Sequence, residues 1–249
     1  NAFVAAAKKI VSGDAGIDMV AGPSEVCVLA DATADATVVA ADLMAQAEHD
    51  PLATCYLVTC DAAFAEKVQG RFAELLAASP RAEITSASLA DQGVVVVAAD
   101  LEAAIDAVNV IAPEHLELHC DNAMGLLGKI ENAGAIFVGP WSSEPLGDYV
   151  AGPNHTLPTG GTAAFSNPLS VQDFITRSSV ICYTPEGLMN DAPATQTMAQ
   201  AEGLWAHALS AGLRRKMVEE GLEGFDGVDL GDINRIAWPV DLAAPKKAE

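Results

Sequence analysis

The sequence predicts an α/β protein in which incomplete Rossmann-like βα units form a mostly parallel sheet, followed by a helical C-terminal region. Three observations lead to this prediction. Short apolar runs of strand length recur between Glu25 and Gly139, and segments with helical spacing of apolar residues separate them. A long Gly- and Pro-rich segment then ends the alternation, and a mainly helical stretch follows it. Repeated βα units imply parallel strands, because each return to the sheet needs a crossover helix.

The apolar runs are the expected strands. The first is Val26-Cys27-Val28-Leu29-Ala30, closed by Asp31, and the others span residues 55–59, 94–97, 116–119 and 135–138. Residues 94–97 are four consecutive valines, and this pattern predicts a strand that is buried on both faces.

Helices are expected between these strands and again after the last one. The expected ranges are residues 34–49, 62–78, 101–110, 122–131 and 186–220. Residues 140–168 are rich in Gly and Pro, which indicates a long loop of the kind that carries function on a rigid scaffold. From Gly221 onward the chain is acidic and Gly-spaced, and we expect a poorly ordered tail there.

The charge balance excludes several classes of protein. The chain has 13 Lys+Arg against 34 Asp+Glu, and the net charge of −21 repels phosphate backbones, which argues against nucleic-acid binding. A hydrophobic content of 51% and a mean hydropathy of +0.25 indicate a globular chain. No apolar run reaches the about 18 residues that span a bilayer, and no signal-peptide pattern opens the chain. A cytoplasmic protein without a membrane partner is therefore expected.

The length of the chain and its cysteines limit the possible domain organisations and exclude some kinds of site. The 249 residues allow one large domain or two ordinary ones. The chain begins Asn1-Ala2-Phe3 without Met, inside an expected helix, so we expect it to be a piece of a longer protein. The number of cysteines is odd and no CxxC occurs, which argues against a disulfide framework or a Cys-rich zinc site. Cys27, Cys55 and Cys120 are expected to be core residues.

Two short histidine motifs stand out near helix and strand ends. Gln46 and His49 are three residues apart at the end of an expected helix, so they share one face and either hold a metal ion together or form an ordinary polar helix end. Glu114 and His115 start a strand, where they either act as a general acid and a general base or are simply exposed to solvent. Ligand crevices of open α/β sheets lie beyond the opposite, carboxyl ends of the strands. His119 is expected to be a half-buried strand histidine.

Other candidates lie in the loop segments and the C-terminal helix. Asp148 and His155 fall in the Gly/Pro-rich segment and suit a hard or borderline cation, or merely solvate the loop. Ser24 precedes the first strand, where its hydroxyl touches a ligand or shapes a turn. Glu202 and His207 are five apart, so on one continuous helix they diverge by about 140°. Together the candidates are a set of nitrogen and oxygen donors, which suits zinc or a similar divalent ion.

The joint order of the motifs is much more specific than any of them alone. The motifs are AGPSEV (21–26), QAEH (46–49), PEHLEL (113–118), GDYVAGPNHTLPTGGTA (147–163) and AExLxAH (201–207). In this order they resemble the histidinol dehydrogenase family, as does the opening NAFVAAAK. The resemblance runs from Asn1 to about Lys216. It implies the last two steps of histidine biosynthesis, in which L-histidinol is oxidised to L-histidine by two successive hydride transfers to NAD, through an aldehyde.

The resemblance also implies a role for each motif residue. One zinc ion per subunit would be held by Gln46, His49, Asp148 and His207, with His207 and Glu202 donated across the interface of a homodimer. His115 would be the general base for the alcohol proton, and Glu114 would activate the water that attacks the aldehyde. Asn1 would contact NAD. Substrate contacts are implied for Ser24, Gln46, His49, His115, Asp148, His155, Glu202 and His207.

The same resemblance predicts a domain organisation with parts missing. Residues 1–24 would end an NAD-binding domain, 25–168 would form the zinc and substrate domain, 169–220 the helical dimerisation region, and 221–249 the acidic tail. Family members are considerably longer, so most of the NAD-binding domain and part of the sheet should be absent, and this chain alone is expected to bind NAD poorly or not at all. The alternatives are a zinc-dependent hydrolase that uses Glu114 and His115 on water, and an inactive fragment that serves as a non-catalytic module.

Overall fold

The structure is a computed structural model, and it describes residues 2–221 and 231–238. Asn1, with its predicted NAD contact, lies outside the described residues, as does most of the predicted acidic tail (222–230 and 239–249). The chain divides into two compact units, residues 1–176 and 177–249, which are described one at a time below. Among the described residues, no helix combines the length and the apolar character that crossing a bilayer requires.

A five-stranded sheet organises the first unit and confirms the predicted α/β fold class. The strands are β1 (Glu25–Ala30), β2 (Thr54–Thr59), β3 (Gly93–Val97), β4 (His115–His119) and β5 (Ala135–Val138). Their order is β3-β2-β1-β4-β5, and every neighbouring pair is parallel. The central strand β1 therefore lies between β2 and β4, with Val26 opposite Cys55 on one side and His115 on the other.

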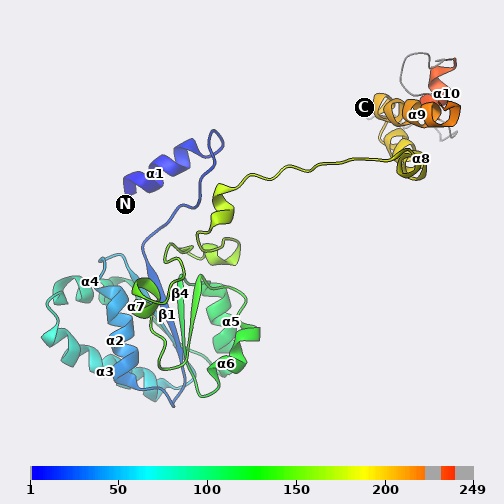
Figure 1. The fold of residues 1–249 in the computed structure, drawn as a ribbon. Helices are drawn as coiled ribbons and strands as arrows, with labels where there is room; N and C mark the ends of the chain where they lie inside the picture. The colour runs from blue at the N-terminus through cyan, green and yellow to red at the C-terminus, as the bar shows by residue number, and fades with distance from the viewer. Residues whose placement is uncertain (1, 222–230, 239–249) are drawn as a thin grey trace, which may run out of the picture. The chain divides into compact units, whose positions relative to one another are not determined.

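Helices cover both faces of this sheet. The helices of this unit are α1 (Ala2–Val11), α2 (Ala36–Ala47), α3 (Ala62–Ala78), α4 (Ala82–Gln92), α5 (Leu101–Ile111), α6 (Ala123–Leu126) and α7 (Glu144–Tyr149), with short 3₁₀ turns at Leu127–Lys129, Thr162–Ala164 and Val171–Phe174. The side chains of Asp35, Asp61 and Asp100 cap the first turns of α2, α3 and α5 by accepting backbone N–H bonds. Figure 1 shows α2, α3 and α4 on one face and α5 and α6 on the other.

The alternation of side chains along each strand produces two cores, one on each face of the sheet. On the α2/α3 face, Val26 and Val28 pack with Leu43 and Val68; on the α5 face, Cys27 and Leu29 pack with residues of α5 and with Leu116 and Leu118 of β4. Since Leu116 and Leu118 face α5, the odd-numbered residues of β4 face α2. All five cysteines are free, and Cys27, Cys55 and Cys120 are buried, as predicted.

Two expectations about this unit were wrong in detail, and one helix was not predicted. The valine strand β3 is an edge strand, and Val94, Val95 and Val97 are 41%, 41% and 50% exposed, because only one side of it is paired. Helix α4 has no counterpart in the sequence prediction, since its apolar residues show no clear helical stripe. The predicted helix 122–131 is one short α-helix followed by a 3₁₀ turn.

The second unit is helical, as predicted, but its helix is interrupted. α8 (Pro185–Ala201) and α9 (Trp205–Glu220) are separate, and α10 (Ile233–Ala237) lies within the segment predicted to be a poorly ordered tail. Glu202 is the C-cap of α8, and Gly203 adopts the left-handed region with φ +74° in the break. The divergence of about 140° between Glu202 and His207 assumed one straight helix and therefore does not apply.

Candidate functional site

A polar cavity lies at the amino ends of β1 and β4. It has a volume of about 460 Å³ and is lined by Ser24, Gln46, His49, Glu114, His115, Glu144, Asp148, Tyr149 and His155. A crossover helix runs back across its sheet face, so the last turn of α2 reaches the same edge at which β1 and β4 begin. This edge differs from the one that the general rule for open α/β sheets favours, which is the edge at the carboxyl ends of the strands.

Glu114 is a buried carboxyl group at the start of β4. Its Oε2 accepts a hydrogen bond from the backbone N–H of Glu25 at 2.9 Å, and it is also hydrogen-bonded to Ser24. Burial, with smaller contributions from the nearby Glu25 and Asp148 carboxylates, raises the pKa of Glu114 to about 8. This carboxyl group therefore exchanges its proton close to neutral pH, which is the range required of a general acid or base.

His115 is held in one tautomer by the backbone of the neighbouring strand. Its Nδ1 lies 2.9 Å from the carbonyl oxygen of Glu25, and a carbonyl only accepts, so Nδ1 carries the hydrogen. Nε2 of the neutral ring is then an acceptor. It is buried, has no hydrogen-bond partner among the described residues, and lies 3.8 Å from Oδ1 of Asp148. Burial lowers the pKa of His115, so the ring is a neutral base aimed at the carboxylate of Asp148.

Gln46 and His49 reach the cavity from the last turn of α2 and the residues after it. Gln46 is almost fully buried, at 1% exposure, and its amide nitrogen donates to both carboxylate oxygens of Glu144 at 3.0 Å when the amide is oriented to suit them. In that orientation the amide oxygen of Gln46 is free to ligate a cation. Both residues line the same cavity, as the spacing of three residues predicted.

Asp148 and Glu144 project from α7, a short helix inside the segment that was predicted to be a loop. They are four residues apart and therefore share one face of the helix. Burial first, and then the carboxylates of Asp148, Glu117, Glu114 and Asp42, raise the pKa of Glu144 to about 9. α7 packs very closely on β5, because a Cβ built on Gly147 would lie 2.6 Å from the ring of Phe137. Phe137 in turn contacts the ring of His115, with the centroids 6.1 Å apart.

The donor chemistry of the cavity fits a divalent cation. His115, Glu144 and Asp148 each offer one ligand atom, and these atoms lie within 4.8 Å of one another. A cation stabilises both the unpartnered Nε2 of His115 and the ionised form of Glu144, whose pKa burial raises to about 9. The predicted ligands Gln46, His49 and Asp148 line the same cavity, so the structure offers more nitrogen and oxygen donors there than one tetrahedral ion needs.

The first unit brings most of the predicted site residues together. Ser24, Gln46, His49, Glu114, His115, Asp148 and His155 all line the one cavity. Glu202 and His207 belong to the second unit and are exposed there, so their contributions stay predictions. Sequence reasoning missed Glu144 and Tyr149. Glu144 could have been found by the rule that singled out Gln46 and His49, because it lies four residues before Asp148.

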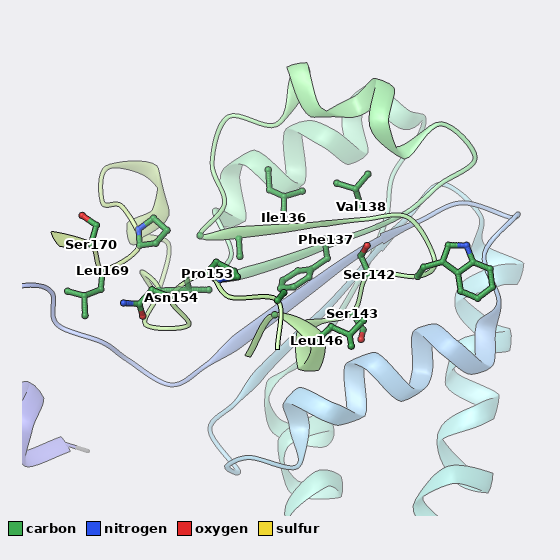
Figure 2. Close-up of a pocket in the computed structure, with 17 residues that line it drawn as sticks. Ile136, Phe137, Val138, Ser142, Ser143, Leu146, Pro153, Asn154, Leu169 and Ser170 are labelled. Atoms are coloured by element: carbon green, nitrogen blue, oxygen red, sulfur yellow. The ribbon is translucent and has the colours of Figure 1, made fainter. Parts of the chain in front are cut away.

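A second, apolar hollow lies beside the polar cavity. It has a volume of about 840 Å³, and Figure 2 shows its wall of Ile136, Phe137 and Val138 from β5, with Leu146 of α7 and the loop residues Pro153 and Leu169 around it. Its lining contains no His, Asp or Glu. It therefore lacks the acid–base groups that the polar cavity has.

The comparisons with known proteins point to one family, and the matches cover nearly the whole chain. The family model described as histidinol dehydrogenase matches residues 1–215. The chain is 50% identical to a histidinol dehydrogenase of Halalkalibacterium halodurans over 214 residues, 86% of this chain and 50% of the relative. It is 53% identical to one of Moorella thermoacetica over 216 residues, 87% of this chain and 51% of the relative.

A solved structure of the same family has a similar fold. The crystal structure of histidinol dehydrogenase from Elizabethkingia anophelis superposes with a TM-score of 0.83 at 39% identity, over 88% of this chain and 51% of that chain. The chain thus spans about half the length of the curated relatives it matches.

Proposed function

This chain belongs to the histidinol dehydrogenase family, and from that membership we propose that it supplies the catalytic and metal-binding groups for the NAD-dependent oxidation of L-histidinol to L-histidine. The single observation that carries the proposal is the polar cavity at the amino ends of β1 and β4, where Glu114 and His115 face Gln46, His49 and Asp148. The enzyme acts in the cytoplasm as a homodimer and has no membrane or nucleic-acid partner.

The metal ligands of the proposal come from two helices. Gln46 and His49 of the α2 end and Asp148 of α7 hold one zinc ion, and His207, donated across the dimer interface with Glu202 beside it, completes the set. When bound there, zinc would supply Lewis-acid binding of the substrate's nitrogen donors, which would hold the substrate in one orientation. Ser24 and His155, which line the same cavity, contact the substrate.

His115 is the general base of the oxidation. A hydride can leave the alcohol carbon only if the hydroxyl proton leaves as well, and Nε2 of His115 is the buried, unprotonated acceptor that takes it. The carbonyl of Glu25 holds the ring in this tautomer, and Nδ1–H keeps its bond when Nε2 becomes protonated. The position of the accepting atom is thus fixed before the substrate arrives.

Glu114 acts in the second oxidation. The aldehyde has no hydroxyl hydrogen to lose, so a water molecule must add to it before the second hydride can leave. Glu114, in its ionised form, would take a proton from that water as it attacks. The hydrate must then lose a hydride to a second NAD, and His115, which has first released the alcohol proton to solvent, would take the hydroxyl proton of the hydrate. A pKa of about 8 leaves the Glu114 carboxyl able to exchange protons in the neutral range.

NAD is the proposed hydride acceptor, and Asn1 is its proposed contact in this chain. A dinucleotide carries negative charge on its phosphates, and the net charge of −21 opposes its approach. Binding therefore depends on local donors that overcome this field.

An assay of NADH formation tests the proposal. The longest gene product that contains this chain is purified, loaded with zinc, and mixed with L-histidinol and NAD; two NADH per histidinol are expected, with loss of activity on chelation and recovery with zinc. Absence of NADH from a folded, zinc-loaded protein would reject the proposal. Release of a hydrolysis product without NAD would favour the zinc hydrolase instead.

A further inference from the structure

Three polar side chains that the proposed function does not use lie buried below the cavity. They are Asp42 of α2 and Glu117 and His119 of β4. Glu117 has no solvent exposure and His119 is 4% exposed, so His119 is more buried than its sequence context predicted. The side chain of Asp42 is 13% exposed. Burying a carboxyl group destabilises the fold unless other groups form hydrogen bonds or ion pairs with it. The partners of these side chains therefore indicate what the side chains do.

These side chains form one continuous chain of contacts. Nε2 of His119 lies 3.3 Å from Oε2 of Glu117, within hydrogen-bonding distance, and 3.5 Å from Oδ2 of Asp42, so this nitrogen faces two carboxyl groups. The other oxygen of Glu117, Oε1, accepts the backbone N–H of Glu144 at 2.7 Å. That N–H belongs to the first residue of α7.

The two ends of this series of contacts lie on α2 and α7, the two helices that carry the proposed metal ligands. Asp42 lies one turn before Gln46 on α2, so both residues are on the face that meets β4. Glu144 begins α7, which carries Asp148. The strand between them, β4, carries His115 on the same face as Glu117 and His119, because odd-numbered residues of a strand share a face.

We propose that Asp42, His119 and Glu117 form a positioning chain that fixes α2 and α7 against β4 and so sets the distance between the metal ligands on the two helices. This inference rests on the proposed function of the cavity. Glu117 is its central member, since it alone bonds both His119 and the start of α7. None of the three is a catalytic residue, because each acts through the backbone or side chain of a neighbour.

The substitution Glu117→Gln tests the positioning chain, because it removes the ionisable group of the side chain and leaves the size and shape of the side chain almost unchanged. The Gln amide oxygen still accepts the N–H of Glu144, but a neutral amide replaces the carboxyl group beside Nε2 of His119, so the contact that joins His119 to Glu117 and holds it near Asp42 is weakened. Loss of residues that orient metal ligands lowers metal affinity by about 10- to 100-fold. We expect such a loss of zinc affinity, measured by chelator competition, together with a changed absorption spectrum of the Co²⁺-substituted protein.

Asn109→Ala is the matched control for a general loss of stability. Asn109 joins α5 to the segment before β5 on the opposite face, where it donates to Lys129 and accepts from Glu131. This variant should unfold at a lower temperature while its zinc affinity and Co²⁺ spectrum stay unchanged. If Glu117→Gln does not fold, Asp42→Asn tests the chain from its more exposed end, with the same two measurements.

The outcomes separate this inference from the proposed function. If the parent protein binds zinc and oxidises histidinol while Glu117→Gln and Asp42→Asn keep its zinc affinity and Co²⁺ spectrum, the positioning chain is wrong and the function stands. If the parent protein binds no metal, the proposed function fails first. A second zinc equivalent that only Asp42→Asn removes would also overturn the inference, because the three side chains would then be a metal site of their own.

Discussion

At the scale of single residues, the tautomer of His115 determines what this side chain can do. Replacement by Asn keeps a side-chain N–H that can bond to the carbonyl of Glu25 but removes the basic Nε2. We expect His115→Asn to lower kcat by about 10²- to 10⁴-fold, the usual contribution of a general base, and to leave zinc affinity nearly unchanged. Steady-state NADH formation and chelator competition measure the two effects. A variant with the parent kcat would exclude the proposed base.

The two acid–base residues are expected to differ in the step that they affect. In Glu114→Gln the amide oxygen still accepts the N–H of Glu25, so the local fold is kept, but no ionisable group remains to activate water. We expect oxidation of the supplied aldehyde to fall by about 10²- to 10⁴-fold, while oxidation of the alcohol to the aldehyde falls much less. Single-turnover NADH formation from each compound distinguishes the steps. An equal loss in both would contradict the separate role of Glu114.

At the scale of elements, α7 determines where Asp148 lies, and its close packing makes it sensitive to a single methyl group. In Gly147→Ala the new Cβ would lie 2.6 Å from the ring of Phe137, so either α7 or that ring, which contacts His115, has to shift. We expect zinc affinity to fall while the protein still folds, and Phe137→Leu to restore part of the affinity. Gly70→Ala in α3 is the control, because its Cβ meets nothing within 4 Å. Unchanged affinity in Gly147→Ala would show that α7 tolerates the shift.

The elements also show which parts of the structure the sequence could predict. Every strand of the sheet and the helices α2, α3 and α5 were predicted, because short apolar runs and a helical stripe are local patterns. The exposure of β3 was not predicted, because a run of four valines is compatible with both a central and an edge strand. Only the pairing of distant segments determines which position the strand takes. Glu144 was missed for a different reason: its spacing of four residues from Asp148 is visible in the sequence, but the segment was read as a loop, in which helical spacing has no meaning.

The predicted site residues of the first unit line one cavity, and the position of each motif at an end of a local element explains why. Gln46 and His49 end a helix, and Glu114 and His115 start a strand, so correct elements placed them at one edge of the sheet. The contacts of Asp42 in the positioning chain could not be predicted from the sequence, because Asp42 lies 75 positions before Glu117 and 77 positions before His119 and no motif links them.

At the scale of the whole molecule, the excess of acidic groups has a consequence for stability that depends on pH. Burial raises the pKa values of Asp42, Glu114 and Glu144 to about 7, 8 and 9, against 3.8, 4.5 and 4.5 ordinarily. Between pH 5 and 9 the folded, metal-free protein therefore holds protons that the unfolded chain has lost. Each such extra proton makes the free energy of unfolding fall by about 1.4 kcal/mol per pH unit.

The metal-free protein is accordingly expected to lose stability as pH rises from 5 to 9, and urea unfolding followed by circular dichroism measures this. A bound cation replaces those protons as the partner of the carboxyl groups, so the zinc-loaded protein should show a smaller decrease. Glu144→Gln should also reduce the decrease, because the amide is neutral at every pH. If stability rises over this range in the metal-free protein, the buried carboxyl groups are ionised in the fold, and the cavity is already an anionic site before any cation binds.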